Sequence, residues 1–315
     1  MDLSIVISVL NEEESLRELI PWIKQALEGE DLEYEIIIID DGSTDRSWTV
    51  IEQLANEYPI RAISFRRNYG KSAALYCGFE MAQGSYVVTM DADLQDSPEE
   101  IPAMIKMIKD EGYDLVSGWK KKRHDNFFSK NIPSKIYNAT ARRVTKIKLH
   151  DMNCGLKAYK REVVKNIEVY GEMHRYIPYL SKNAGFSNIG EKVVAHKARK
   201  FGKSKFGMNR FINGFLDLLS LWFLSRFGKK PMHFFGLIGS LTFIIGAGTS
   251  LYLIVQKIVT QSKGLPFRAV TDQPLFYISL VALIIGMQLF LSGFIAELVS
   301  RNSSERNNYK IKKRL

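Results

Sequence analysis

The stretch YVVTMDADLQ, residues 86–95, joins a mostly apolar run to alternating carboxylates and an amide. A run of this kind is typical of a strand buried on both faces of a sheet. Asp91, Asp93 and Gln95 follow it directly, so they emerge where the strand ends. Their oxygens are hard ligands of the kind that Mg²⁺ or Mn²⁺ shares with substrate phosphates. The pattern predicts a divalent metal site, and a solvated turn that caps a helix at Pro98 is the alternative.

Strand-like and helical patterns alternate along the first 195 residues. Apolar runs precede helical patterns in four successive units, at 3–10 and 14–27, 34–39 and 45–57, 60–65 and 72–81, and 86–90 and 98–109. Repeated βα units predict an α/β fold whose central sheet is mostly parallel and covered on both faces. Ligands of such sheets bind beyond the carboxyl ends of the strands. We therefore expect the polar residues at 11–14, 40–45 and 91–95 to surround one crevice.

Two common nucleotide-binding motifs are not found in the sequence. No G-x-G-x-x-G follows the first predicted strand, which removes the dinucleotide fingerprint. GKS at 70–72 resembles the end of a P-loop, but Phe65 stands where that loop needs its first glycine. The two cysteines, Cys77 and Cys154, are too few for a disulfide framework and suggest a reducing compartment. The sequence therefore supports neither redox nor NTPase chemistry.

The net charge of +10 at pH 7 is unevenly divided along the chain. Residues 1–196 carry 26 Lys and Arg against 30 Asp and Glu, and residues 197–315 carry 18 against 4. A nucleic-acid-binding domain needs a basic footprint, and the acidic balance of the first part opposes one. The excess of positive charge lies in the second part, where it predicts contact with lipid phosphates and no nucleic-acid partner.

Two uncharged segments in the second part are long enough to cross a membrane. They cover residues 234–255 and 274–296, which are 22 and 23 residues long. At 1.5 Å per residue each spans roughly 33 Å, against about 30 Å of hydrocarbon; a pair of buried core helices is the alternative. The outer flanks at 197–230 and 301–315 carry nine and six Lys and Arg, and the loop between the spans carries three. This excess predicts a multi-pass protein of the cytoplasmic (inner) membrane with both termini in the cytoplasm.

Four regions are predicted along the chain. Residues 1–208 form a cytoplasmic α/β domain, 209–230 an interfacial amphipathic helix, 231–300 a transmembrane hairpin, and 301–315 a basic cytoplasmic tail. The polar residues of the second region fall on one narrow helical stripe, which is typical of a helix that lies in the membrane interface. A third span is the alternative, and Asp217 in its middle argues against it.

Seven motifs occur in the order found in one enzyme family. They are SVLNEE at 8–13, IDDGSTD at 39–45, RNYGK at 67–71, DADLQD at 91–96, DMNCGL at 151–156, HRYIP at 174–178 and RKFGKSK at 199–205. With the paired spans they resemble the family 2 glycosyltransferases of GT-A fold, and among these the polyprenyl-phosphate glycosyltransferases, which include dolichyl-phosphate mannose synthase and bactoprenol glucosyltransferase. The resemblance covers essentially the whole chain. Ser8 and Leu10 replace the Pro and Tyr of the common opening motif, so a stacking contact to the base is not implied.

The resemblance implies a nucleotide-sugar site at the strand ends. Glu12 and Asp41 would contact the base and ribose of a UDP- or GDP-linked sugar, and Asp40 would support that turn. An ordinary capped turn is the alternative for the two aspartates. Lys71 and Asp91 would approach the donor, although a solvated lysine at a helix start is the alternative for Lys71.

The resemblance also implies catalytic groups. Asp91, Asp93 and Gln95 would hold Mg²⁺ or Mn²⁺ and the donor diphosphate, and Asp93 would be essential for transfer. Arg123 would act at the reacting phosphates. Asp151 matches an acidic position near the reacting centre, where it would orient the acceptor, act as a base or pair with a nearby cation.

The acceptor implied by the resemblance is a polyprenyl phosphate, which is already an ionised nucleophile near neutral pH because its second pKa is about 6. The site must hold two anions close together, and this requires cations beyond the metal. Five basic residues of the motifs and their surroundings are assigned to phosphate contacts, namely Arg123, Arg175, Arg199, Lys203 and Lys205. A solvated or lipid-facing basic patch is the alternative.

These assignments predict inverting transfer of a hexose, with glucose or mannose as the first candidates, from a nucleotide sugar to a membrane polyprenyl phosphate. The product would be a lipid-linked monosaccharide for cell-envelope glycan assembly, and homo-oligomers are compatible with the sequence. A processive polysaccharide synthase is the nearest alternative, but the Q-x-x-R-W motif of those enzymes does not occur. A catalytically silent membrane protein that binds nucleotide sugar is the other alternative.

Overall fold

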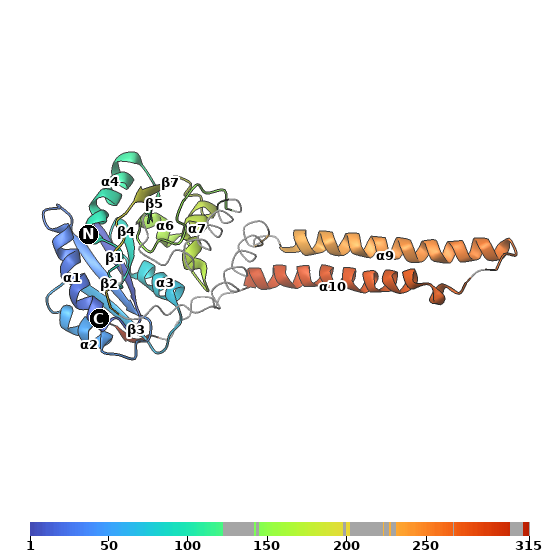
Figure 1. The fold of residues 1–315 in the computed structure, drawn as a ribbon, viewed down its shortest axis with the longest axis horizontal. Coiled ribbons are helices and arrows are strands. Elements are labelled where there is room, and N and C mark those ends of the chain that lie inside the picture. The colour runs from blue at the N-terminus through green and yellow to red at the C-terminus, as the bar shows by residue number, and fades with distance from the viewer. Residues whose placement is uncertain are drawn as a thin grey trace. The chain divides into compact units, whose positions relative to one another are not determined.

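A computed structural model describes residues 1–121, 142, 145–197, 200–201, 223, 227, 231–266, 268–302 and 311–314. The chain forms two compact units, of which the first comprises Met1–Leu218 with Arg306–Leu315 and the second Leu219–Glu305 (Figure 1). The predicted interfacial helix at 209–230 lies outside the described residues, apart from positions 223 and 227.

The first unit is built on one mixed sheet. Its described strands are β1 Leu3–Val9, β2 Tyr34–Asp40, β3 Ile60–Phe65, β4 Tyr86–Asp91, β5 Leu115–Trp119, β6 Lys157–Lys160, β7 Ile189–Val193 and β8 Ile311–Arg314. They follow the order β7-β5-β6-β4-β1-β2-β3-β8. The β1–β2, β1–β4, β2–β3 and β5–β7 pairs are parallel, and β6 and β8 pair antiparallel with their neighbours. The predicted α/β class with a mostly parallel sheet is confirmed.

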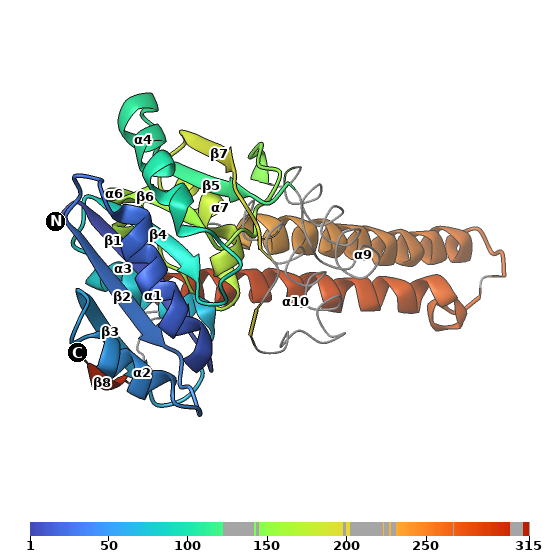
Figure 2. The ribbon, with the colours of Figure 1, turned by 60° about the vertical axis from the view of Figure 1, so that its left-hand side comes forward.

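Helices cover both faces of this sheet (Figure 2). They are α1 Glu13–Leu27, α2 Ser47–Leu54, α3 Lys71–Met81, η1 Pro98–Glu100, α4 Ile101–Glu111, α6 Arg161–Lys165, η3 Met173–Tyr176 and α7 Ile177–Asn183. Strand residues alternate between two cores, since Ile5 packs with α1, α2 and α4, whereas Val6 packs with α3, α6 and α7. This alternation buries both faces, which explains the continuous apolar strands in the sequence.

Two helices begin later than the sequence pattern suggests. Asp45 lies before α2, where its carboxylate accepts a hydrogen bond from the Ser47 backbone N–H at 2.9 Å. The side chain thus satisfies a donor that the first helical turn leaves unpaired, and Ser47 becomes the first helical residue. Residues 98–100 form the 3₁₀ turn η1 before α4 begins at Ile101.

The strand register brings the polar loops to one edge of the sheet. Val9 lies opposite Asp40, and Ser8 lies opposite Asp91, so the carboxyl ends of β1, β2 and β4 are level. Gly42 has a φ of +74°, and a Cβ atom there would lie 2.5 Å from the Arg67 carbonyl carbon. Glycine therefore allows the turn after β2 to pack against the loop after β3.

The second unit contains two long helices, α9 Pro231–Ser262 and α10 Pro274–Asn302, with the short turn η4 Val270–Asp272 between them. Both are long and apolar enough to cross a membrane, and most of each apolar window is exposed to the surroundings. A pair of water-soluble core helices would bury such a surface. The helices include the predicted spans at 234–255 and 274–296.

Small residues allow α9 and α10 to approach closely. A Cβ atom at Gly239 would lie 2.7 Å from the Gly286 carbonyl oxygen, and one at Gly246 would lie 2.8 Å from the Ser279 carbonyl oxygen. The hydroxyl groups of Ser250 and Ser279 lie 2.8 Å apart in the same interface. Close backbone packing and interhelical hydrogen bonds are the interactions that hold helices together in lipid.

We predict that Gly246→Ala lowers the thermal stability of the helix pair, whereas Gly248→Ala does not. Both changes raise helix propensity by about 1 kcal/mol, but only the Cβ at position 246 meets the backbone of α10, and position 248 has open space. Thermal unfolding of the full chain in detergent, followed by the helical circular dichroism signal, compares the two variants. Equal melting temperatures would show that the close approach at Gly246 does not stabilise the pair.

Candidate active site

The site begins with the loops after β1 and β2, which are tied together by side chains. The Asn11 carboxamide oxygen accepts the Thr44 N–H at 2.7 Å, and the Ser43 hydroxyl accepts the Asn11 N–H at 2.9 Å. Asn11 has a φ of +53°, a left-handed conformation that asparagine tolerates better than most residues. Glu12 lies beside this junction, where its carboxylate accepts a hydrogen bond from the Ser15 hydroxyl at 2.5 Å.

Asp40 is buried and supports the turn after β2. One carboxylate oxygen accepts the Ser43 N–H at 3.0 Å, and the other accepts the Ser64 hydroxyl at 2.7 Å. The first bond closes the turn after β2, and the second joins the ends of β2 and β3, so Asp40 fixes the geometry of the loop. Its assignment to a nucleotide-sugar site stays a prediction.

Asp41 holds the loop that leads into α3. Its two carboxylate oxygens accept the backbone N–H groups of Tyr69 and Gly70 at 2.7 and 2.9 Å. Burial raises the pKa of Asp41, although these two hydrogen bonds act in the opposite direction. The carboxylate therefore anchors the turn that presents Lys71, the first residue of α3. Its predicted contact to base or ribose stays a prediction.

Asp91 lies at the centre of a cluster of charged groups. Its carboxylate forms an ion pair with the Lys71 ammonium group, and Gly155 approaches so closely that a Cβ there would lie 2.5 Å from Oδ2 of Asp91. Burial alone would raise the pKa of Asp91, but the ammonium groups of Lys71 and Lys120 outweigh it and lower that pKa to about 2. Asp91 is therefore a carboxylate at neutral pH.

The loop after β4 turns sharply behind Asp91. Leu94 is buried with a φ of +61°, and the Asp93 carboxylate accepts the Gln95 N–H at 3.2 Å. Asp96 is completely buried and forms an ion pair of 2.6 Å with Lys120, which is 12% exposed and follows β5. The structure thus places Lys120 inside the domain as the partner of Asp96.

Asp151 is buried and lies four residues before Gly155, the glycine that approaches Asp91. Its backbone N–H donates to the Glu191 carboxylate at 3.1 Å, and its own carboxylate accepts the Asn153 N–H at 3.3 Å. The three functions proposed for Asp151 stay predictions.

The α3 side of the site includes a histidine and an arginine. Ser72 Oγ lies 3.0 Å from Nδ1 of His174, and Arg175 pairs with Glu172 at 3.3 Å. Burial lowers the pKa of His174 well below its ordinary value, and the charges of Lys71 and Arg175 lower it further. The imidazole is therefore neutral at pH 7.

Sequence reasoning missed Lys157, a fully enclosed lysine in β6. Its ammonium group donates to the Cys154 carbonyl oxygen, and burial lowers its pKa. A lysine between apolar residues in a four-residue strand gives no recognisable pattern, so the sequence offered no signal for it. Asp96 was missed as a paired residue for the same reason, because its partner is distant in the sequence.

The structure describes one of the five predicted acceptor cations, Arg175, which is largely buried beside Glu172. The other four lie outside the described residues, namely Arg123, Arg199, Lys203 and Lys205. The residues assigned to the nucleotide sugar and metal, in contrast, are all described, and the structure brings them together. They are Glu12, Asp40, Asp41, Lys71, Asp91, Asp93 and Gln95.

The oxygen atoms at the end of β4 suit a divalent cation as ligands. Within the described residues, His, Cys, Asp and Glu side chains form no group of three or more arranged for metal binding. Mg²⁺, however, is commonly bound through one or two carboxylates while substrate phosphates and water supply the remaining ligands. Asp91, Asp93 and Gln95 provide such an incomplete oxygen set on one loop, so the residues present fit Mg²⁺ or Mn²⁺.

Comparison with known proteins gives sequence matches over nearly the whole chain. The family model for glycosyl transferase family 2 matches residues 4–168. Dodecaprenyl-phosphate galacturonate synthase of Rhizobium johnstonii is 35% identical over 308 residues, which cover 96% of this chain and 88% of the relative. Undecaprenyl-phosphate 4-deoxy-4-formamido-L-arabinose transferase of Proteus mirabilis is 33% identical over 302 residues, which cover 95% of this chain and 88% of that relative.

Solved structures share the fold of the first unit. Glucosyl-3-phosphoglycerate synthase of Mycobacterium tuberculosis in complex with UDP has a TM-score of 0.55 and 21% identity over 70% of this chain and 80% of that chain. The complex of that enzyme with Mn²⁺, UDP-glucose and phosphoglyceric acid has a TM-score of 0.53 and is 19% identical in sequence. The match covers 71% of this chain and 79% of that chain. The likeness confirms the predicted GT-A fold class.

We predict that Lys120→Met lowers the free energy of unfolding of the first unit by about 3 kcal/mol, because it leaves Asp96 buried without its cation. Lys121→Met is the matched control, since that exposed lysine lies over the Trp119 ring and is paired with no buried acid among the residues that the structure describes. Urea unfolding followed by tryptophan fluorescence measures both. Adding Asp96→Asn to Lys120→Met should restore part of the loss, and equal effects of the two lysine variants would contradict the role of the buried pair.

We predict that His174→Gln makes stability less dependent on pH. The folded protein keeps this imidazole neutral, whereas the unfolded chain takes up a proton below about pH 6.5. Stability of the wild type therefore falls as the pH drops below that value, by at most about 1.4 kcal/mol per pH unit for this group. Unfolding free energies between pH 7 and 5.5 should show a shallower slope for the variant, and an unchanged slope would contradict the assignment.

Proposed function

The chain belongs to glycosyltransferase family 2, and from this membership we propose that it transfers one sugar from a nucleotide sugar to a membrane polyprenyl phosphate. The chain is thus a glycosyltransferase, and the proposal concerns its donor and acceptor. The two relatives compared above are named for transfer to dodecaprenyl phosphate and undecaprenyl phosphate. Alignment over more than nine-tenths of this chain, including both apolar helices, supports a polyprenyl phosphate as acceptor here.

The observation that carries the proposal is the position of the Asp91 loop at the end of β4, level with the end of β2. We assign Glu12, Asp40 and Asp41 to the nucleotide side of the crevice. Asp91, Asp93 and Gln95 would hold Mg²⁺ or Mn²⁺, which neutralises the departing diphosphate when bound.

Lys71 is assigned to the same diphosphate because it faces Asp91 from the first turn of α3. A cation at this place offsets negative charge that develops on the leaving group. Lys71 begins α3 directly after the turn that the Asp41 carboxylate holds in place. The donor site is therefore supported by two aspartates with different tasks, one for charge and one for loop geometry.

The proposed reaction needs little help from a general base. A phosphate oxygen of the acceptor attacks the anomeric carbon, the bond from that carbon to the diphosphate oxygen breaks, and the nucleoside diphosphate leaves with the electron pair. Because the attacking phosphate is ionised near pH 7, the main task is to hold two anions together. We assign that task to Arg123, Arg175, Arg199, Lys203 and Lys205. Asp151 would orient the acceptor, act as base or pair with one of these cations.

The second unit is proposed as the membrane anchor. Helices α9 and α10 would form a hairpin whose connecting loop lies on the far side of the cytoplasmic membrane, with both termini and the catalytic domain in the cytoplasm. The domain organisation proposed for the chain is 1–208, 209–230, 231–300 and 301–315. In this topology the catalytic domain and the acceptor headgroup would both be on the cytoplasmic side of the membrane.

A labelled-donor panel tests the function. Membranes containing the full chain are incubated with undecaprenyl phosphate and one labelled nucleotide sugar at a time. UDP-glucose and GDP-mannose test the proposed hexoses. Nucleotide-linked forms of galacturonate and 4-deoxy-4-formamido-L-arabinose, the sugars in the names of the two relatives, complete the panel. Label in an extractable monoglycosyl lipid is the expected result. Label in polymer would favour a processive synthase, and no incorporation from any donor would contradict the proposal.

We predict that Asp93→Asn lowers transfer in this assay by about a hundredfold or more, because one carboxylate of the proposed metal site is lost. Asp110→Asn is the matched control, since Asp110 is an exposed residue near the end of α4. Purified variants in detergent are compared at equal concentration, with Mn²⁺ varied. Transfer by Asp93→Asn at the rate of the control would remove Asp93 from the active site.

A further inference from the structure

Residues 194–197, which follow β7, form a strap across the loop that carries the predicted metal ligands. The Lys197 N–H donates to the Gln95 carbonyl oxygen at 2.9 Å, and the Gln95 side-chain nitrogen lies 3.5 Å from the Lys197 carbonyl oxygen. Asp96 and His196 form an antiparallel bridge beside them. The loop is thus held by the strap through both its backbone and the Gln95 amide.

The loop needs an external restraint because its own conformation is strained. Leu94 has a φ of +61° and a buried side chain, so the peptide turns in a region that leucine rarely adopts. Residues in this region persist only where the surroundings enforce the conformation, and such strain is concentrated at functional sites. Gln95 follows Leu94 directly, so the direction of Gln95 depends on this turn.

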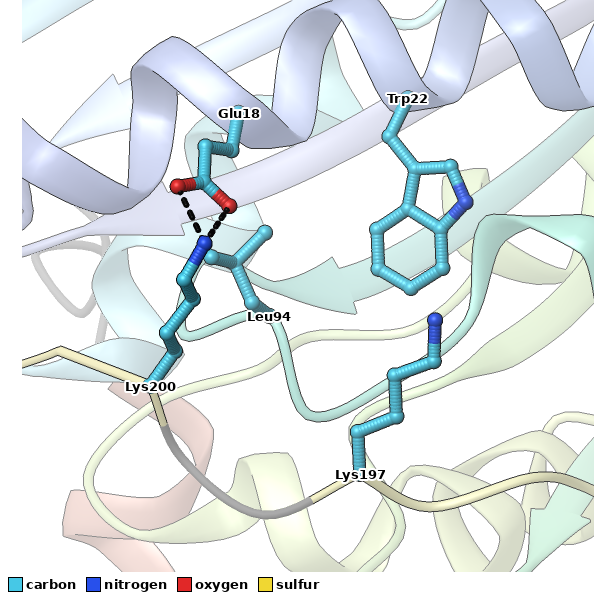
Figure 3. A pocket seen from close by; sticks show the side chains of 5 residues that line it. All are labelled: Glu18, Trp22, Leu94, Lys197 and Lys200. Atoms are coloured by element: carbon cyan, nitrogen blue, oxygen red, sulfur yellow. Dashed lines mark hydrogen bonds and ion pairs between the residues drawn. The ribbon is translucent and has the colours of Figure 1, made fainter.

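The strap is itself attached to α1 by one side chain. The Lys197 ammonium group lies 4.0 Å from the centre of the Trp22 ring (Figure 3). The Trp22 indole N–H donates to Glu99 at 3.2 Å. An ammonium group over an indole face is attracted by the negative charge density of the ring, and Trp is the strongest partner for this contact. The indole is therefore fixed between the strap and η1.

A cavity of about 440 Å³ beside this contact is lined by Glu18, Trp22, Leu94, Lys197 and Lys200 (Figure 3). Because the space is open, side-chain packing does not hold the strap against α1 at this point. The Lys197–Trp22 contact and the Lys200–Glu18 ion pair of 2.6 Å span it. Of these two lysines, Lys197 is the one whose backbone bonds to Gln95.

We propose that Trp22 and Lys197 are positioning residues for Gln95, and that this clamp sets the orientation of the Gln95 amide toward a divalent cation. With the amide nitrogen directed at the strap carbonyl, the oxygen, which is the end able to bind a cation, is directed away from the strap. The inference rests on the proposed function through the predicted metal site.

Two variants break the clamp, and two others keep it. Lys197→Met removes the cation while it preserves the length of an exposed side chain, and Trp22→Leu removes the ring. Trp22→Phe keeps an aromatic face and should rescue most of the effect. Lys200→Met is the matched control, because Lys200 lines the same cavity but pairs with exposed Glu18.

The readout is binding of Mn²⁺ alone to the purified full chain, measured from the signal of free Mn²⁺ in electron paramagnetic resonance. We expect Lys197→Met and Trp22→Leu to raise the dissociation constant about three- to tenfold, and Lys200→Met to change it by less than about twofold. Hydrogen exchange of the 92–96 amides should accelerate in the two clamp variants, with the melting temperature unchanged in Lys197→Met.

Unchanged Mn²⁺ binding in Lys197→Met, or equal losses in that variant and Lys200→Met, would overturn the proposal, as would a wild-type chain that binds no Mn²⁺. If Trp22→Leu fails to fold, Lys197→Met and Trp22→Phe still decide the question. If Mn²⁺ binding depends on the clamp but the wild type transfers no sugar, the proposed function is refuted while the positioning role of Trp22 and Lys197 stands. The failures of the two proposals are therefore distinguishable.

Discussion

The arrangement of the site depends on keeping the Asp91 carboxylate ionised in a partly enclosed position. Burial alone would raise the pKa of an isolated carboxylate there, because burial disfavours the charged form. Lys71 from the start of α3 and Lys120 after β5 offset that penalty from two directions. Lys120 is in turn held by Asp96, so positive and negative groups alternate from α3 to the interior. The loop after β4 is thus fixed by charge pairing as well as by packing.

Charge alternation explains why the aspartates near the crevice differ in environment. Asp40 and Asp41 use their oxygens on hydroxyl and backbone N–H groups, which are uncharged partners that orient turns. Asp91 instead faces ammonium groups, is partly exposed and has a strongly lowered pKa. In the proposed donor site, a diphosphate beside Asp91 would bring more negative charge, and Lys71 is the residue that we assign to offset it.

The sequence allowed the prediction of those parts that depend on local pattern. The runs that become β1 to β4, the helices between them and the two long apolar helices have periodicity or length that one segment reveals by itself. The short antiparallel strand β6 and the edge strand β8 were not foreseen, since four residues give no periodic signal and their partners are distant. The same reason hid the Lys120–Asp96 pair, because burial of a lysine follows from topology and not from its neighbours in the sequence.

The site is assembled from segments that are distant in the sequence. Lys71, Asp91 and Lys120 come from different βα units, and the strap that contacts Gln95 follows β7 at the far edge of the sheet. Each element is rigid, but the loop that joins them at Leu94 is strained. A strained loop cannot set its own geometry to the accuracy that metal ligands need, so the geometry must be imposed by contacts around it. Residues that never touch a substrate can therefore govern binding at this site through the elements that they hold in place.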